Sequence, residues 1–283
     1  MAVALAVSAC GSGGDEAVAG AGDLGHIHDL VIDEDGRLLV ASHTGLYRID
    51  NVDQAVLVGS DRHDLMPMTS DGAALIASGH PDLRVEEYRV RDRPPFLGLA
   101  RSTDSGKSWE VVDLLGDADF HALTTTETGL FAPETSGRIW HLDDNGVWSQ
   151  RGEVAARDLA IKPDDPDQQL APDYEGNVWV SADGAETWTA ATDTPALIEI
   201  EWIDDDTIAG FTESATVWTA ADSAGPWTKI ATSPSLPGGD IEVETFYVDP
   251  LGEWWITVRG GSIFRSTNAG TSWDQACAPP EQA

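Results

Sequence analysis

Histidine is the residue type with the clearest chemical potential in this sequence. The 283 residues include seven histidines, and six of them fall where short strand-like segments begin or end. These six are His26, His28, His43, His63, His80 and His121. Imidazole binds zinc, copper and iron, and it also transfers protons because it titrates near neutral pH. The sequence therefore predicts a histidine-rich site, either for a transition metal such as zinc or copper or for acid–base chemistry.

Within this set, His28, His63 and His121 are the strongest candidates for metal ligands, because each lies in the first strand of a repeated unit. His43 and His80 end second strands and are the next candidates. His26 alternates with His28, so both side chains are expected on the same strand face. For any one of these histidines alone, the ordinary alternative is a hydrogen-bonded residue of the core or of a channel wall.

Carboxylates, arginines and a tyrosine occupy corresponding positions in other units. Glu199 with Glu242, or Glu134 with Asp173, are candidate pairs of catalytic carboxylates, as a glycoside hydrolase requires. The separation that such a pair needs is not visible in a sequence. Further candidate ligand-binding residues are Arg157, Arg259, Tyr174, His26, Asp29 and Asp64.

The elements that must position these residues are marked by a repeated turn. Residues 102–109 read Ser-x-Asp-x-Gly-x-x-Trp, and imperfect copies follow at 181–188, 220–227 and 266–273. In such a turn a short acidic side chain caps backbone N–H groups, glycine adopts a positive φ, and tryptophan anchors the turn in the core. The residues assigned to these structural turns are Ser102, Asp104, Gly106, Trp109, Ser181, Asp183, Trp188, Asp222, Trp227, Ser266, Asn268, Gly270 and Trp273.

A turn that recurs about every 40 residues is typical of a β-propeller. Six units of four short strands can be drawn, at residues 26–58, 63–114, 120–154, 157–191, 197–231 and 241–276. We therefore expect residues 24–283 to form one all-β domain, a six-bladed propeller with four antiparallel strands per blade; five or seven blades are the alternatives. Because strands alternate in direction, the start of each first strand and the end of each second strand share one face near the channel. The repeated turns lie on the opposite face.

An insertion at residues 81–96 interrupts the second unit. It gathers Arg84, Arg89, Arg91 and Arg93 in a chain that has few basic residues. A long loop in a compact fold is often a lid or a binding loop. The equal alternative is a solvated excursion whose arginines are balanced by Glu86 and Glu87.

The formal net charge of −33 argues against any nucleic-acid partner.

The N-terminal residues indicate a cellular location. Residues 1–9 are apolar, and Val7-Ser8-Ala9-Cys10 resembles a bacterial lipobox, in which the cysteine is lipidated. Residues 1–10 are thus expected to be a lipoprotein signal peptide and residues 11–23 a flexible tether. We expect export and attachment to the outer face of a bacterial cytoplasmic membrane through the lipid at Cys10 alone.

The turns and the blade pattern resemble those of BNR/Asp-box propellers, which include sialidases, the luminal domain of sortilins and photosystem II assembly factors. The resemblance is strongest to glycosylhydrolase-like bacterial lipoproteins of this group, at residues 25–33, 38–48, 60–66, 75–81, 97–110 and 114–123. It implies a propeller and an exported location. Sialidase chemistry requires three arginines for the substrate carboxylate, whereas only Arg157 and Arg259 occupy suitable positions here.

Three functions remain as predictions. The first is a binding or scaffold protein whose histidine-rich channel mouth holds a metal, a small molecule or a glycan. The second is a glycoside hydrolase with chemistry other than that of a sialidase. The third is an assembly platform whose loop at residues 81–96 contacts a protein partner.

Overall fold

The computed structural model describes residues 18–19, 24–51, 54–223, 225–232 and 242–277. The expected signal peptide with Cys10 and most of the expected tether lie outside these residues. Val18–Ala19 form a two-residue strand, β1, which pairs with β5 at the outer edge of the first blade. Within the described residues, no helix is long and apolar enough to cross a membrane.

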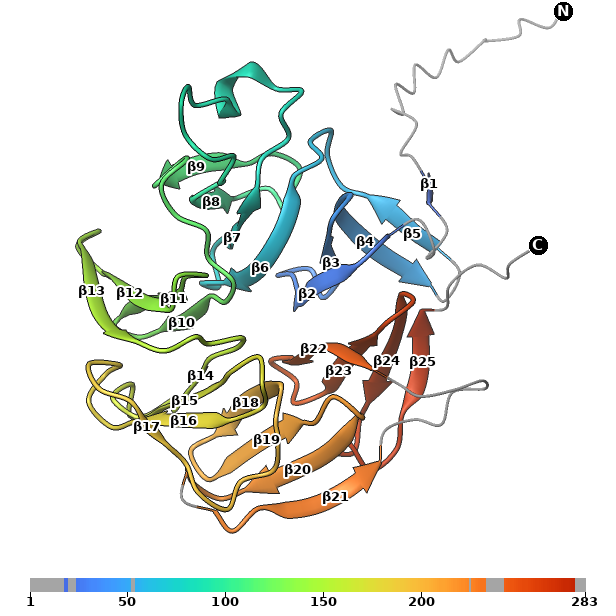
Figure 1. The fold of residues 1–283 in the computed structure, drawn as a ribbon. Helices are drawn as coiled ribbons and strands as arrows, with labels where there is room; N and C mark the ends of the chain where they lie inside the picture. The colour runs from blue at the N-terminus through green and yellow to red at the C-terminus, as the bar shows by residue number, and fades with distance from the viewer. Residues whose placement is uncertain (1–17, 20–23, 52–53, 224, 233–241, 278–283) are drawn as a thin grey trace, which may run out of the picture.

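Six antiparallel sheets surround a central axis, and the predicted six-bladed propeller is confirmed (Figure 1). Blade 1 contains β2 (Ile27–Ile32), β3 (Leu38–Ser42), β4 (Gly45–Asn51) and β5 (Gln54–Leu57). Blade 2 contains β6 (Asp64–Ser70), β7 (Leu75–His80), β8 (Leu99–Ser102) and β9 (Glu110–Asp113). Blade 3 contains β10 (Thr124–Thr126), β11 (Gly129–Pro133), β12 (Arg138–Asp143) and β13 (Trp148–Glu153).

The last three blades have the same strand order as the first three, with the first strand innermost. Blade 4 contains β14 (Ala160–Ile161), β15 (Gln169–Pro172), β16 (Val178–Ser181) and β17 (Thr189–Ala190). Blade 5 contains β18 (Glu199–Asp204), β19 (Thr207–Phe211), β20 (Thr216–Ala220) and β21 (Thr228–Thr232). Blade 6 contains β22 (Val243–Val248), β23 (Trp254–Val258), β24 (Ser262–Ser266) and β25 (Asp274–Cys277).

The hydrophobic core lies between neighbouring blades, because each sheet buries apolar side chains against the next one. One cluster joins Val31 and Leu46 of blade 1 to Leu65 and Leu75 of blade 2. Another joins blade 1 to Trp255, Ile263 and Cys277 of blade 6. Each blade uses one continuous stretch of the described chain, and the ring closes by this side-chain packing between blades 1 and 6.

The repeated turns are alike in their hydrogen bonds. Ser102 Oγ accepts the N–H of Gly106 at 2.8 Å and donates to Asp104 Oδ1 at 2.8 Å, while Asp104 accepts the N–H of Ser108 at 3.0 Å. The turns that begin at Ser181 and Ser266 repeat this pattern, with Asn268 replacing the aspartate in the second. Ser102 pairs with Leu75, at the opposite end of β7 from His80. The turns therefore lie away from the histidines, as the strand directions require.

Two departures from the expected turn sequence leave the turn intact. Ala185 stands where glycine was expected, and it adopts a φ of 68°, like Gly106 at 82° and Gly270 at 74°. In blade 5 the N–H of Gly225 donates to the carbonyl of Asp222, and Trp227 packs against the core between blades 4 and 5. In blade 4 the bonds to Ser181 and Asp183 thus sustain the turn without the glycine. Blade 5 has Ala220 in place of the serine and keeps the aspartate and the tryptophan.

The insertion between β7 and β8 is tied down within the protein. It contains a short 3₁₀ helix, η2 (Glu86–Tyr88), whose buried Tyr88 donates from its hydroxyl to the carbonyl of Trp109 at 3.3 Å. Arg84 pairs with Asp82, and Arg93 pairs with Asp117. Arg89 donates to the carbonyl of Leu83. Three of its four arginines are therefore engaged locally, which favours a structured excursion of blade 2 over a lid.

Candidate functional site

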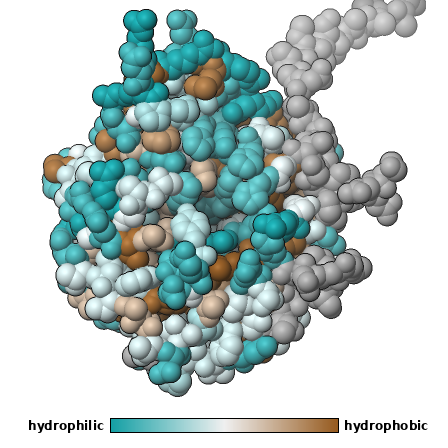
Figure 2. All heavy atoms as spheres, in the orientation of Figure 1, coloured by the Kyte–Doolittle hydropathy of each residue, from teal (hydrophilic) through white to brown (hydrophobic). Residues whose placement is uncertain are grey.

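The innermost strands surround a cavity of about 850 Å³ that all six blades line. The face in Figure 2 is mostly hydrophilic and is hollowed near the centre of the ring. His26, His28, His121, Arg157, Tyr174 and Arg259 all line this cavity. The structure thus brings polar residues from separate units of the sequence to one place.

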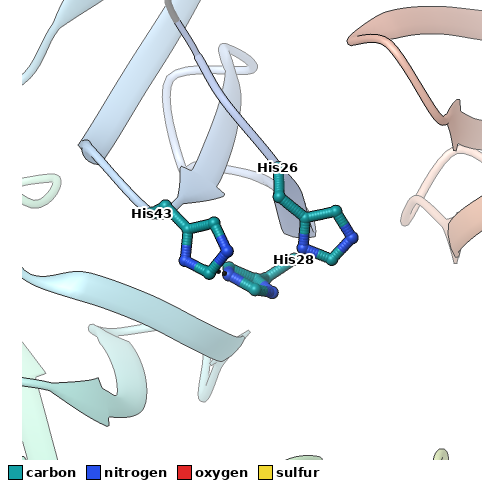
Figure 3. Close-up of side chains that lie close together, drawn as sticks. All are labelled: His26, His28 and His43. Atoms are coloured by element: carbon teal, nitrogen blue, oxygen red, sulfur yellow. Dashed lines mark hydrogen bonds between the residues drawn. The ribbon is translucent and has the colours of Figure 1, made fainter.

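Three histidines of blade 1 lie close together (Figure 3), and two of them, His26 and His28, line this cavity. His28 lies in β2, His26 directly precedes it, and His43 directly follows β3. The hairpin positions them, because the N–H of His43 donates to the carbonyl of His26 at 3.3 Å. One ring nitrogen from each histidine lies within 4.8 Å of the others. Such a group is able to hold a metal ion.

Asp64 of blade 2 adds a carboxylate to this group. Its Oδ1 lies 2.8 Å from His43 Nδ1 and 3.2 Å from His28 Nε2, and these two nitrogens are 3.1 Å apart. Zinc bonds of about 2.0–2.1 Å would place tetrahedral ligand atoms about 3.3–3.5 Å apart. The three atoms therefore already have nearly the spacing of ligands that share one ion.

The pKa values of two residues in the group are shifted towards the forms that coordinate metals. Burial alone would raise the pKa of Asp64, but hydrogen bonds with His28, His80 and His43 outweigh it and hold that pKa well below its usual value. Burial, and then repulsion from His28 and His43, lowers the pKa of His26. An ionised carboxylate and a neutral imidazole are the forms that coordinate metals.

Glu244 of blade 6 contacts His26. Its Oε1 is 3.1 Å from His26 Nε2, and its side chain is 6% exposed. Burial raises the pKa of Glu244 to about 7. Glu244 was not among the predicted site residues. Its place in the first strand of blade 6 is the only signal that could have indicated it.

His63 does not join the other histidines, and the alignment that placed it with His28 was wrong. Leu30 pairs with Val40, three residues before His43, whereas Met68 pairs with Ala77, three residues before His80. Met66 therefore occupies the position of His28.

The shift is three residues along the whole strand, because β2 and β6 carry corresponding irregularities, between Ile27 and Asp29 and between Leu65 and Met68. Asp64 therefore corresponds to His26, and His63 precedes β6. His63 is consequently buried beside the insertion. Its Nδ1 accepts the N–H of Asp82 at 3.0 Å, and its ring meets the ring of Tyr88 edge-on at 4.7 Å.

Glu134 and Asp173, the second candidate catalytic pair, each form hydrogen bonds within a turn. Glu134 accepts hydrogen bonds from Arg138 and from the Trp140 indole at 2.8 and 3.0 Å. Asp173 accepts three bonds from Asn177 and a further one, at 3.0 Å, from the indole of Trp179. These bonds show that both carboxylates help to hold their turns, whatever further role they have.

Glu199 and Glu242, the other candidate catalytic carboxylates, each form a separate ion pair on the cavity wall. Glu199 accepts from Arg157 Nε at 3.1 Å, and Glu242 pairs with Arg259. Burial raises the pKa of Glu199 well above its usual value, although Arg157 opposes the shift. The two arginines are thus engaged by acids, which leaves them less available for an anionic ligand.

Asp29, which lines the cavity, also holds two blades together. Its Oδ2 accepts the N–H of Met68 in blade 2 at 2.8 Å. Asp158 does the same between blades 4 and 5, where its Oδ2 accepts the N–H of Ile200 at 2.8 Å. In both cases the other oxygen accepts the N–H of the next residue. Each of these aspartates thus links its own blade to the first strand of the next blade by a hydrogen bond.

The titration of Asp158 leads to a testable pH dependence. Burial raises the pKa of Asp158 to about 6, although bonds from Ile200 and Leu159 favour the ionised form. The pKa in the unfolded chain is about 4, so the folded protein binds more protons between these values. The free energy of unfolding should therefore fall as the pH rises through this window.

Asp158→Asn is expected to flatten that fall by up to about 1.4 kcal/mol per pH unit. Urea unfolding between pH 4 and pH 7 measures it. The exposed Asp205→Asn is the control and should leave the slope unchanged. Parallel curves for Asp158→Asn and the wild type would show that Asp158 titrates normally.

Comparisons with known proteins identify the fold. No family model and no curated protein matches the chain. The WD40 propeller domain of Doa1 has a TM-score of 0.60 at 11% identity, over 95% of this chain and 85% of that one. A structure of YCF48 bound to a D1 peptide has a TM-score of 0.57 at 15% identity, over 93% and 84%.

An enzyme is also among the similar structures. The GH74 xyloglucanase of Xanthomonas campestris has a TM-score of 0.56 at 14% identity, over 92% of this chain. This chain spans only 46% of that enzyme. These identities support a shared fold and nothing finer: the chain is a six-bladed β-propeller, similar in architecture to a WD40 domain, to YCF48 and to a GH74 xyloglucanase.

Proposed function

We propose that the protein binds a transition metal, zinc or copper, at the mouth of its channel. The ligands are His28 Nε2, His43 Nδ1 and Asp64 Oδ1, with His26 as a fourth. The observation that carries this proposal is the mutual spacing of 2.8–3.2 Å among the first three atoms. Nitrogen and oxygen donors in this combination suit zinc or copper.

The adjoining cavity supports a binding role for the ion. An ion at this position would face a space of about 850 Å³ with polar walls, which is large enough for a small molecule or a short glycan. The ion would then take part in holding such a ligand.

Metal analysis tests the proposal. After chelator treatment and reconstitution, the wild-type protein should retain zinc or copper, and His28→Gln and His43→Gln should each lower the content by one ion per chain. His63→Gln is the control, because His63 is a histidine outside the group. Equal metal content in the wild type and both variants would contradict the site.

The cellular location remains part of the proposal. Export and a lipid at Cys10 rest on the lipobox resemblance, and membership of the BNR/Asp-box group is supported by the hydrogen bonds shared by the repeated turns. Metabolic labelling with a fatty acid, compared with Cys10→Ser, tests the anchor. Equal labelling of both would contradict it.

A glycoside hydrolase is the second candidate function. It is favoured by the buried Glu199 on the cavity wall, whose raised pKa suits a general acid. A panel of aryl glycosides, with Glu199→Gln as the inactive control, tests it. A protein partner is the third candidate, since YCF48 was captured with a D1 peptide. Deleting residues 81–96 and comparing the co-purifying proteins tests the predicted contact.

A further inference from the structure

A second group of side chains lies beside the first, at the junction of blades 2 and 3. Asp119 connects β9 to β10, and its carboxylate lies between two imidazoles. Its Oδ1 is 3.9 Å from His80 Nε2, and its Oδ2 is 3.5 Å from His121 Nε2. Neither pair forms a hydrogen bond. Two histidines thus direct their Nε2 atoms towards a single carboxylate.

The remaining nitrogen of each histidine has a partner of its own. His80 Nδ1 lies 3.4 Å from Asp64 Oδ2, and His121 Nδ1 lies 3.2 Å from the hydroxyl of Tyr174. Metal-binding histidines usually have this arrangement, in which an outer partner fixes the ring while the other nitrogen coordinates the ion. Asp64 and Tyr174 are therefore placed as outer partners.

Two atoms of this group lack a partner. Asp119 Oδ1 and His121 Nε2 are inaccessible to solvent and form no hydrogen bond with any residue that the structure describes. Asp119 is 7% exposed. The unpaired Oδ1 faces His80 Nε2, and the unpaired His121 Nε2 faces the other oxygen of Asp119. Buried polar atoms are almost always paired, so these two unpaired atoms indicate a bound species among the three side chains.

We propose that His80 Nε2, Asp119 and His121 Nε2 bind a second divalent transition metal ion. Ligand atoms that share an ion at about 2.1 Å lie about 3.0–3.6 Å apart. The His121 contact already falls in this range, and the His80 contact needs to shorten by a few tenths of an ångström. Two histidines and one carboxylate suit zinc or ferrous iron and leave coordination positions free for water or a ligand.

The second site is linked to the first but does not depend on it. Asp64 directs Oδ1 to His28 and His43 and Oδ2 to His80. The second site uses no ligand histidine of the first. Its failure and the failure of the proposed function are therefore distinguishable by experiment.

Titration of the metal-free protein with Co²⁺, followed by its visible absorption and by metal analysis, tests the proposal. The wild type should bind two ions per chain, and Asp119→Asn and His121→Gln should each bind one. His28→Gln should also bind one, and the combination with Asp119→Asn should bind none. The second site would be overturned by either of two results. In the first, the wild type binds two ions and both persist in Asp119→Asn and His121→Gln. In the second, the wild type binds one ion, which is lost only in His28→Gln.

Tyr174→Phe provides a test that does not disturb the fold, because the Tyr174 side chain is exposed at the rim. Loss of its hydroxyl should weaken binding of the second ion about 10–100-fold and leave the first unchanged. Unaltered affinity for both ions would contradict the role of Tyr174 as the outer partner of His121. One ion that is lost in Asp119→Asn but not in His28→Gln would support the second site and overturn the first.

Discussion

Asp64→Asn should weaken binding of the first ion by at least about 100-fold, the largest effect that we expect from one side chain of the site. Asp64 is the only carboxylate in contact with both His28 and His43 among the described residues. Its oxygens contact histidines of both blade 1 and blade 2, and its low pKa keeps it charged. Asparagine preserves the shape but removes the charge that offsets that of the cation.

A competition titration against a chromophoric chelator measures this affinity. Asp61→Asn is the matched control, since Asp61 is a nearby carboxylate whose histidine neighbour is the structural His63. The control should bind metal like the wild type. Affinities for Asp64→Asn within about threefold of the wild type would show that the histidines bind the ion without Asp64.

Gly79→Ala is expected to destabilise the protein by about 3 kcal/mol or more. Gly79 has a φ of 130°, and a Cβ there would lie 2.1 Å from the carbonyl oxygen of Asp64 and 2.9 Å from the N of Met66. Both are backbone atoms of the adjacent strand, so they cannot rotate away. The β6–β7 pairing that positions Asp64 and His80 would have to separate.

Urea unfolding measures the loss. Gly72→Ala is the control, because Gly72 also has a positive φ, 83°, but a Cβ there would meet nothing within 4 Å. It should cost only the backbone strain, about 1 kcal/mol. Equal costs at the two positions would show that the contact with Asp64 is relieved without loss of pairing.

The second strands were predictable from the sequence because their register is continuous. Leu38–Ser42 and Leu75–His80 are uninterrupted apolar strands, so His43 and His80 could be placed at equivalent ends. The first strand of blade 2 was not predictable in the same way. The letters His-Asp-Leu recur three residues too early in blade 2, so matching them placed His63 at the position that Met66 occupies, although β2 and β6 carry corresponding irregularities.

The sequence indicates the roles of some acidic residues more clearly than those of others. A glycine three residues after Glu134 and Asp173 marked a tight turn, since Gly137 and Gly176 donate to their carbonyls, and this signal could have identified both acids as structural. Asp119 had no comparable signal. It lies between two blades, and its contacts with His80 and His121 depend on how the blades pack. The residue pattern within one strand does not predict this packing.

Construction of each blade from one continuous stretch has a consequence for the order of folding. Pairing within a blade joins residues that are close in the chain, so a blade can form early at a small cost in loop entropy. The carboxylate and imidazole groups of the two sites come from blades 1, 2 and 3, and they meet only when these blades have docked. Metal uptake during refolding would therefore report the docking of blades separately from the formation of strands.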